Sequence, residues 1–181
     1  MTRWIGLTGP MGAGKDYAFN TMLTMGAHVM RMSFADGLRI EIQQTLGLEH
    51  PIQKPYTELE RKLQQWWGTD YRRAEDPDYW VRLAEHRAEV LEAETGLTPV
   101  FTDVRFPNEA DMITRHGGLL VQVLAGKKIR EVRLGMEPPQ HESETALAGY
   151  LWPTDTYALH SVGDGDMYQR AIVMLLKAAG I

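Results

Sequence analysis

A glycine-rich run near the start of the chain has the residue types and spacing best suited to chemistry. It reads Gly-Pro-Met-Gly-Ala-Gly-Lys-Asp at residues 9–16 and matches G-x-x-x-x-G-K, with Asp16 where Ser or Thr usually stands. Glycines let successive backbone N–H groups curl around an anion in conformations that a Cβ would obstruct. Lys15 would add a full charge, and a following helix would add its positive N-terminal end. The run predicts a polyphosphate-binding loop made of Gly9, Met11, Gly12, Ala13, Gly14, Lys15 and Asp16.

Two alternatives stay open at this loop. The run could be an ordinary glycine-rich turn between a strand and a helix, although its position before a helical pattern favours phosphate binding. The carboxylate of Asp16 is a hard oxygen ligand that could hold Mg²⁺ directly or through water. It could equally be an acidic residue that the helix dipole favours in a first turn.

A second segment, Phe-Thr-Asp-Val-Arg-Phe-Pro-Asn-Glu at residues 101–109, places an acid and a base at the exit of an apolar run. In open parallel sheets, ligands bind at the carboxyl ends of strands, which is also the edge that carries a strand-to-helix phosphate loop. Asp103 could then bind Mg²⁺ through water and Arg105 could bind a phosphate. The alternative is that Asp103 and Arg105 form a surface ion pair.

The elements that must position these residues follow from the apolar patterns. Strands are expected at residues 3–8, 28–34, 99–104 and 119–124, with a weaker one at 157–162. Helices are expected from about Lys15 to Gly26, between Asp36 and Glu94, from Pro107, and at the C-terminus. Thr57 and Glu60 form a capping-box signal within the helical region. Strands that alternate with helices, without hairpin signals, predict an α/β fold with a mainly parallel sheet covered on both faces.

Length and composition set further bounds. The chain has 181 residues, a formal net charge of −5 and no cysteine, which fits one globular domain over residues 1–181. The acidic balance argues against nucleic acid or an anionic membrane as partner. The absence of disulfides and of a long apolar run leads us to expect a cytoplasmic protein.

Together with further segments, these motifs resemble the phage-type deoxynucleoside monophosphate kinases. The supporting segments are the loop with its Asp variant, Ser33-Phe34-Ala35-Asp36 with Leu38-Arg39, Gln65-Trp66-Trp67-Gly68-Thr69-Asp70, Asp76-Pro77-Asp78-Tyr79-Trp80-Val81, residues 103–109, and His141-Glu142-Ser143-Glu144. The resemblance implies a P-loop NTPase fold with three α/β/α layers, a helical monophosphate-binding insertion and a basic lid. It also implies ATP as donor, Mg²⁺ as cofactor, a deoxynucleoside monophosphate (dNMP) as acceptor and, if a phage encodes the chain, the host cytoplasm as its location.

A lid is expected at about residues 126–142. Phosphoryl transfer between two polyanions requires charge neutralisation and exclusion of water, and a movable basic segment supplies both. Residues 126–133 carry four cations, of which Arg130 is the best candidate for stabilising the transferred charge and Arg133 the second. With Lys15 and Asp103, Arg130 completes the predicted catalytic set. The alternative is a solvated helix face, the usual role of a charge run.

The acceptor is expected against an insertion at about residues 36–80. Its predicted ligands are Asp36, Arg39, Trp66, Arg72 and Arg73, joined by Arg105, Arg133, His141, Ser143 and Glu144. The tryptophans of this region are more often core residues than base-stacking platforms. Ser143 could instead cap a helix.

Two other functions compete with the nucleotide kinase. One is a P-loop small-molecule kinase that phosphorylates a hydroxyl group and therefore needs a general base. The other is a nucleotide-binding switch without fast turnover. The sequence leaves the accepted bases and a homodimer open.

Overall fold

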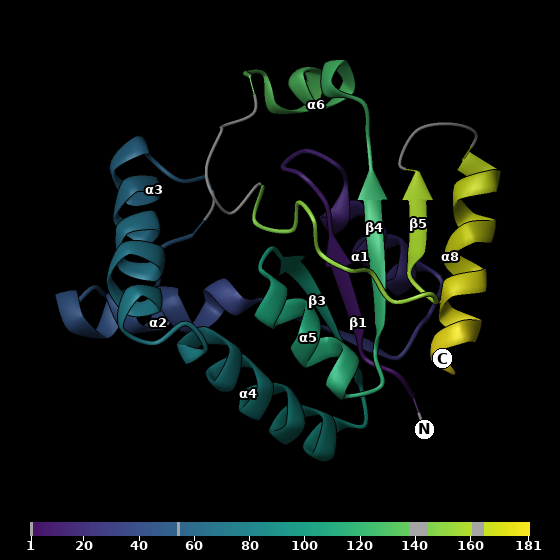
Figure 1. The fold of residues 1–181 in the computed structure, drawn as a ribbon, viewed down its shortest axis with the longest axis horizontal. Helices are drawn as coiled ribbons and strands as arrows, with labels where there is room; N and C mark the ends of the chain where they lie inside the picture. The colour runs from purple at the N-terminus through teal and green to yellow at the C-terminus, as the bar shows by residue number, and fades with distance from the viewer. Residues whose placement is uncertain (1, 54, 138–144, 161–164) are drawn as a thin grey trace.

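A five-stranded parallel sheet forms the centre of the computed structural model, which describes residues 2–53, 55–137, 145–160 and 165–181 (Figure 1). The strands lie in the order β2-β3-β1-β4-β5, and every adjacent pair is parallel. Their bounds are β1 (Ile5–Thr8), β2 (Val29–Met32), β3 (Thr98–Val104), β4 (Leu119–Leu124) and β5 (Tyr157–His160). The predicted parallel sheet is confirmed. Strand β2 ends earlier than expected because the backbone of Ser33 already forms the N-cap of the next helix.

Helices connect the strands, and four helical segments follow one another between β2 and β3. Their bounds are α1 (Lys15–Thr24), α2 (Phe34–Leu46), α3 (Glu58–Gln65), η1 (Trp66–Arg73), α4 (Tyr79–Thr95), α5 (Pro107–Arg115), α6 (Lys127–Leu134) and α8 (Gly165–Ala179). The segment η1 is a π-helix, which the sequence patterns do not predict. No helix in the described parts of the chain is long and apolar enough to cross a membrane.

Each face of the sheet carries its own core, which confirms the three-layer architecture. On one face α1 and α8 pack through residues such as Met22 and Ile172 against Ile5 and Leu7. On the other face α4 and α5 pack against Phe101 and its neighbours. Side chains alternate along the strands because successive residues point to opposite faces. Figure 1 shows α8 and the α4–α5 pair on opposite sides of the sheet.

A third, smaller core belongs to the predicted insertion. It contains Leu38, Ile42, Ile52 and Trp80. Trp80 is 2% exposed and its Nε1 donates to the Gly68 carbonyl at 2.9 Å, so the core interpretation is correct for this tryptophan. The capping box at the start of α3 is also confirmed. Leu59, in the first turn of α3, is 76% exposed.

The turn after β1 is pinned against β4. A Cβ added to Gly9 would lie 2.2 Å from the carbonyl oxygen of Val123, and the φ of Gly9 is +130°. Backbone atoms cannot move away from such a clash as a flexible side chain can. Gly26, at the end of α1, also has a positive φ (+78°), but a Cβ there would meet nothing within 4 Å.

This pair of glycines gives a matched test of the packing. Gly26→Ala should destabilise by about 1 kcal/mol through its backbone conformation alone. Gly9→Ala should cost about 1–3 kcal/mol more because it adds the overpacking against β4. Chemical denaturation of both variants measures the difference. Equal losses of unfolding free energy would show that the turn is not held against β4.

Candidate active site

The glycine-rich loop that is predicted to bind phosphate lies between β1 and α1, the position that the sequence analysis gives it. Gly9, Gly12 and Gly14 have φ values of +130°, +77° and +106°, in the left-handed region that favours glycine. Gly14 is the N-cap of α1 and Lys15 its first residue. The Lys15 ammonium donates to the carbonyl of Gly9 and, at 3.2 Å, to that of Pro10. The lysine thus lies over the loop, close to the positive end of the helix.

Helix α6, the predicted lid segment, lies next to the phosphate loop. Arg133 Nη1 donates to the carbonyls of Gly12 and Ala13 at 3.1 and 3.2 Å. The Cβ of Arg130 lies 3.3 Å from the position that a Cβ on Gly12 would take. The Arg130 Nε is shielded from solvent and has no hydrogen-bond partner among the described residues. The structure therefore brings the two predicted lid arginines to the loop.

Lys127, by contrast, belongs to the outer surface of α6. Its ammonium pairs with Glu137 at 2.9 Å and Glu131 at 3.6 Å, and the hydrogen bond with Glu137 raises its pKa. The solvated-face interpretation therefore fits Lys127, whereas the lid roles of Arg130 and Arg133, which lie beside the loop, stay predictions. Residues 138–144 of the predicted lid lie outside the described residues, and with them the predicted substrate ligands His141, Ser143 and Glu144.

The two predicted metal ligands have different surroundings. Asp16 lies in the first turn of α1, 58% exposed, with Arg31 at 3.7 Å. The described residues contain no group of three or more His, Asp or Glu side chains that could hold a metal ion. Such a group is not required, because Mg²⁺ in phosphoryl-transfer sites commonly takes one or two carboxylates together with phosphate oxygens and water.

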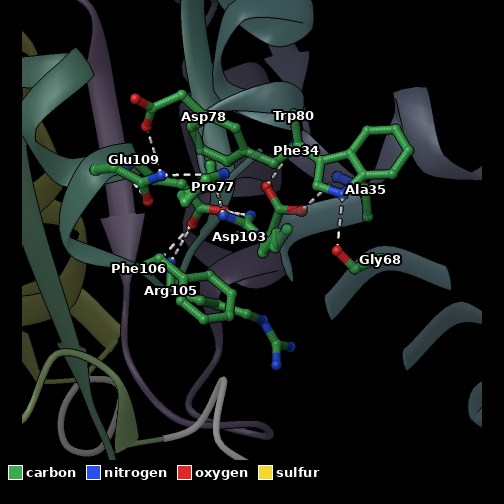
Figure 2. A network of polar contacts seen from close by, with 12 residues as sticks. Phe34, Ala35, Gly68, Pro77, Asp78, Trp80, Asp103, Arg105, Phe106 and Glu109 are labelled. Carbon is green, nitrogen blue, oxygen red and sulfur yellow. Dashed lines mark hydrogen bonds and ion pairs between the residues drawn. The ribbon is translucent and has the colours of Figure 1, made fainter. Parts of the chain in front are cut away.

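Asp103 joins the end of β3 to the start of α2. Its Oδ2 accepts from Ser33 Oγ at 2.6 Å and from Ala35 N at 3.2 Å, and its Oδ1 accepts from Phe34 N at 3.0 Å (Figure 2). The N–H groups of Phe34 and Ala35 are in the first turn of α2 and have no partner within the helix, and the helix dipole also favours a carboxylate there. Both oxygens of Asp103 are therefore already hydrogen-bonded. Its role as a metal ligand through water stays a prediction.

Glu109, which the sequence analysis did not select, lies at the centre of the same edge. It is 2% exposed, and its Oε2 accepts from the backbone N–H groups of Arg105 and Phe106 at 2.7 and 3.1 Å (Figure 2). Its other oxygen pairs with Arg73, whose guanidinium lies 4.1 Å from the centre of the Phe106 ring. Pro107 at the first helical position and an acid three residues after the N-cap were visible signals for this arrangement.

The environment of Glu109 favours its protonated form. Burial raises its pKa to about 7 and the nearby Asp103 charge adds to the rise, while Arg73 and the two backbone N–H groups act in the opposite direction. The ion pair itself favours a charged carboxylate, so burial is the stronger influence here.

The predicted acceptor-side residues are largely engaged with partners inside the protein. Arg39 pairs with Asp36 and donates to the Tyr56 hydroxyl at 3.1 Å. Arg87 lies 3.7 Å from Asp36. Arg72 donates through Nε to Glu41 at 2.6 Å. The predicted substrate contacts of these residues stay predictions.

Trp66 differs from the core tryptophans. It is 52% exposed and stacks on Tyr71 with ring centres 5.8 Å apart and 11° between the planes. It therefore lies on the surface of η1, where a base could stack on it. Arg105 follows β3 and is held through its backbone by Glu109.

Comparison with known proteins extends this description. No family model matches the chain. It is 31% identical over 147 residues to uncharacterized protein ORF77 of Ictalurid herpesvirus 1 (strain Auburn), which is 81% of this chain and 59% of the viral protein. The chain thus spans about three fifths of the curated relative that it matches.

Several solved structures share the fold at low sequence identity. TT1252 from Thermus thermophilus has a TM-score of 0.58 at 19% identity, covering 98% of this chain and 97% of that one. A gluconokinase from Sinorhizobium meliloti 1021 has a TM-score of 0.51 at 15% identity, covering 98% and 93%. A sugar kinase from Janibacter sp. HTCC2649 has a TM-score of 0.51 at 14% identity, covering 99% and 98%. The chain therefore shares the α/β fold of these proteins, with its five parallel strands in the order β2-β3-β1-β4-β5.

The burial of Glu109 predicts a pH-dependent stability difference. Its pKa is about 7 in the folded protein against a reference value of 4.5, so the folded state binds more protons between these values. Stability from this group is therefore present below the lower value and is lost as the pH rises through the higher one. Glu109→Gln does not titrate, so the stability of the wild type relative to this variant should fall between about pH 5 and pH 8.

Denaturant unfolding of both proteins across that range measures the difference, and other carboxylates cancel in the comparison. A difference that stayed constant or grew with pH would mean that Glu109 is ionised in the folded protein throughout.

Proposed function

We propose that this chain is an ATP-dependent kinase that transfers the γ-phosphate of ATP to a dNMP, giving a dNDP and ADP. The observation that carries the proposal is the position of α6, which brings Arg130 and Arg133 onto a phosphate loop that already contains Lys15. Three cations at one loop suit the charge that develops on a transferred phosphoryl group. On this proposal the enzyme works in the cytoplasm, which is the host cytoplasm if a phage encodes it.

The loop fits the donor. The backbone at Gly9, Gly12 and Gly14 is in conformations available mainly to glycine, so a polyphosphate could lie close to the main chain. Residues 9–16 would bind the phosphates through backbone N–H groups, with Lys15 on the outer ones. Asp16 and, through water, Asp103 would hold Mg²⁺, which supplies charge neutralisation between the phosphates when bound.

Transfer to a phosphate acceptor requires the acceptor oxygen to be aligned with the γ-phosphorus, and it requires no general base to remove a proton from the acceptor. An oxygen of the acceptor phosphate, mostly dianionic at neutral pH, bonds to the γ-phosphorus while the bond from that phosphorus to the β–γ bridging oxygen breaks. ADP leaves with the electron pair of that bond. Arg130 would stabilise the group in transfer, and Arg133 would bind phosphate after release from Gly12 and Ala13. Residues of the insertion and Arg105 would hold the acceptor phosphate.

A second candidate is a kinase with an alcohol acceptor, which the gluconokinase and sugar kinase among the similar structures favour. A hydroxyl acceptor needs a general base near the phosphate loop. Asp103 lies at the carboxyl end of β3, where a base would be needed, but both its oxygens accept hydrogen bonds from the start of α2. This arrangement weakens Asp103 as a base and favours the phosphate acceptor.

The acceptor is tested by initial rates with ATP and Mg²⁺ across the four common dNMPs, their ribonucleotide counterparts, gluconate and other sugar-type alcohols. We expect turnover with at least one dNMP and none with the alcohols. Lys15→Ala should lower kcat by a factor of roughly 10³ or more, by analogy with the loss of a single transition-state arginine. Activity confined to an alcohol acceptor would reject the proposal in favour of the second candidate.

The lid role of Arg130 has its own test. Arg130→Ala should lower kcat by roughly 10²-fold or more while ATP affinity changes far less, because the contact is made to the group in transfer. Lys128→Ala is the matched control, since Lys128 is an exposed cation on the same helix. Equal losses of kcat and ATP affinity in Arg130→Ala would show that Arg130 binds ground-state ATP instead.

A further inference from the structure

Three arginines of the insertion are candidates for binding the acceptor phosphate, and their side chains differ in how many donors are already used. Arg39 uses both terminal nitrogens, on Tyr56 and Asp36. Arg73 uses Nη2 on Glu109 and points Nη1 at the Pro77 carbonyl at 3.4 Å. Arg72 donates only through Nε, and its two terminal nitrogens have no partner among the described residues. Its side chain is 28% exposed, so the open end can be reached.

Arg72 is also held in place. Glu41 Oε1 accepts from both Arg72 Nε at 2.6 Å and Trp67 Nε1 at 2.8 Å, and Glu41 Oε2 accepts from the Tyr79 hydroxyl at 2.7 Å. The Arg72 guanidinium lies 4.8 Å from the centre of the Tyr79 ring and 5.0 Å from that of Tyr71. Helices α2 and α4 and segment η1 therefore all contribute to fixing one guanidinium.

The charge of Glu41 is maintained at this position. Burial acts to raise its pKa, but hydrogen bonds from Trp67, Tyr79 and Arg72 together hold the pKa of this carboxyl below its usual value. When a guanidinium donates to one carboxylate through Nε, its two terminal nitrogens remain as a planar fork that can bind a second anion. The π-helical geometry of η1 is also consistent with a binding site, since π-helical segments are frequent at functional sites.

Arg72 lies near the edge of the sheet that carries the phosphate loop. Its neighbour Arg73 contacts Glu109 at the start of α5, which directly follows the exit of β3. Consecutive Cα atoms are about 3.8 Å apart, so the backbone of Arg72 lies directly beside the residue that contacts this turn.

We propose that Arg72 is the ligand of the acceptor phosphate and that Glu41 is its positioning residue, assisted by Tyr79 and Trp67. This inference rests on the proposed function for the identity of the acceptor. It also assigns structural roles to Arg39, which joins α2 to Tyr56, and to Arg73, which joins η1 to α5. Specificity for a phosphate over an alcohol acceptor then comes from the preset fork of Arg72.

The test separates the acceptor subsite from the donor loop. A non-hydrolysable ATP analogue with Mg²⁺ first saturates the loop, and methyl phosphate or thymidine monophosphate is then titrated while tryptophan fluorescence is followed. Trp67 shares Glu41 with Arg72, so occupation of the fork should change its emission. We expect saturable binding in the wild type. The dissociation constant should be at least tenfold larger in Arg72→Met, because this variant loses charged hydrogen bonds to the phosphate.

Glu41→Gln should raise the acceptor dissociation constant and KM by roughly tenfold with KM for ATP unchanged. The variant that carries both Glu41→Gln and Arg72→Met should bind the acceptor no more weakly than Arg72→Met alone, because Glu41 acts through Arg72. Tyr79→Phe keeps the ring and removes one hydrogen bond, so it should show a smaller effect in the same direction. Arg82→Met is the matched control, since Arg82 is an exposed arginine paired with Asp76 in the same region, and it should bind as the wild type does.

Each outcome decides a different claim. Additive losses in the double variant, wild-type binding by Glu41→Gln, or no saturable binding of methyl phosphate in the wild type would overturn the inference. Turnover of a dNMP with an unchanged acceptor KM in Arg72→Met would overturn it and leave the proposed function standing. Methyl phosphate binding that requires Arg72, without turnover of any dNMP, would support the subsite and reject the proposed function.

Discussion

The close packing of the phosphate loop against β4 is the constraint on which the rest of the site depends. At Gly9 the main chain comes so near to the Val123 carbonyl that no side chain fits between them. Strand β4 is the neighbour of β1 in the sheet, and α6 begins three residues after β4 ends. A helix that follows β4 so closely must start beside the loop that follows β1. The order of the strands thus brings the basic helix to the phosphate loop.

Three carboxylates, of which Glu109 is buried and Asp103 and Glu41 are partly exposed, organise the side of the molecule proposed to bind the acceptor. Asp103 holds the N-terminus of α2, Glu109 holds the turn after β3 together with Arg73, and Glu41 holds Arg72. Negative charges near the proposed site for two phosphates would repel such substrates if they stood alone. Here Glu41 and Glu109 are paired with arginines and Asp103 is bonded to a helix N-terminus, so they position cations and helix ends without leaving an uncompensated anion.

The sequence predicts the sheet and the backbone of the glycine-rich loop well, because both depend on local signals. The glycine spacing, the position of Lys15 and the apolar strands lie in short continuous segments. The acceptor side depends on pairs that are distant in the chain. Arg72 and Glu41 are 31 residues apart, and Arg73 and Glu109 are 36 residues apart. No periodicity specifies which of three arginines finds which acid, or that residues 66–73 form a π-helix.

A crystal structure with a bisubstrate analogue, in which a phosphate chain joins adenosine to a deoxynucleoside, tests the central claim most directly. The account predicts that one end of the phosphate chain lies within the glycine loop under α6 and that the other end meets the guanidinium of Arg72. The account is contradicted if the phosphates lie outside residues 9–16, or if the deoxynucleoside end lies away from η1.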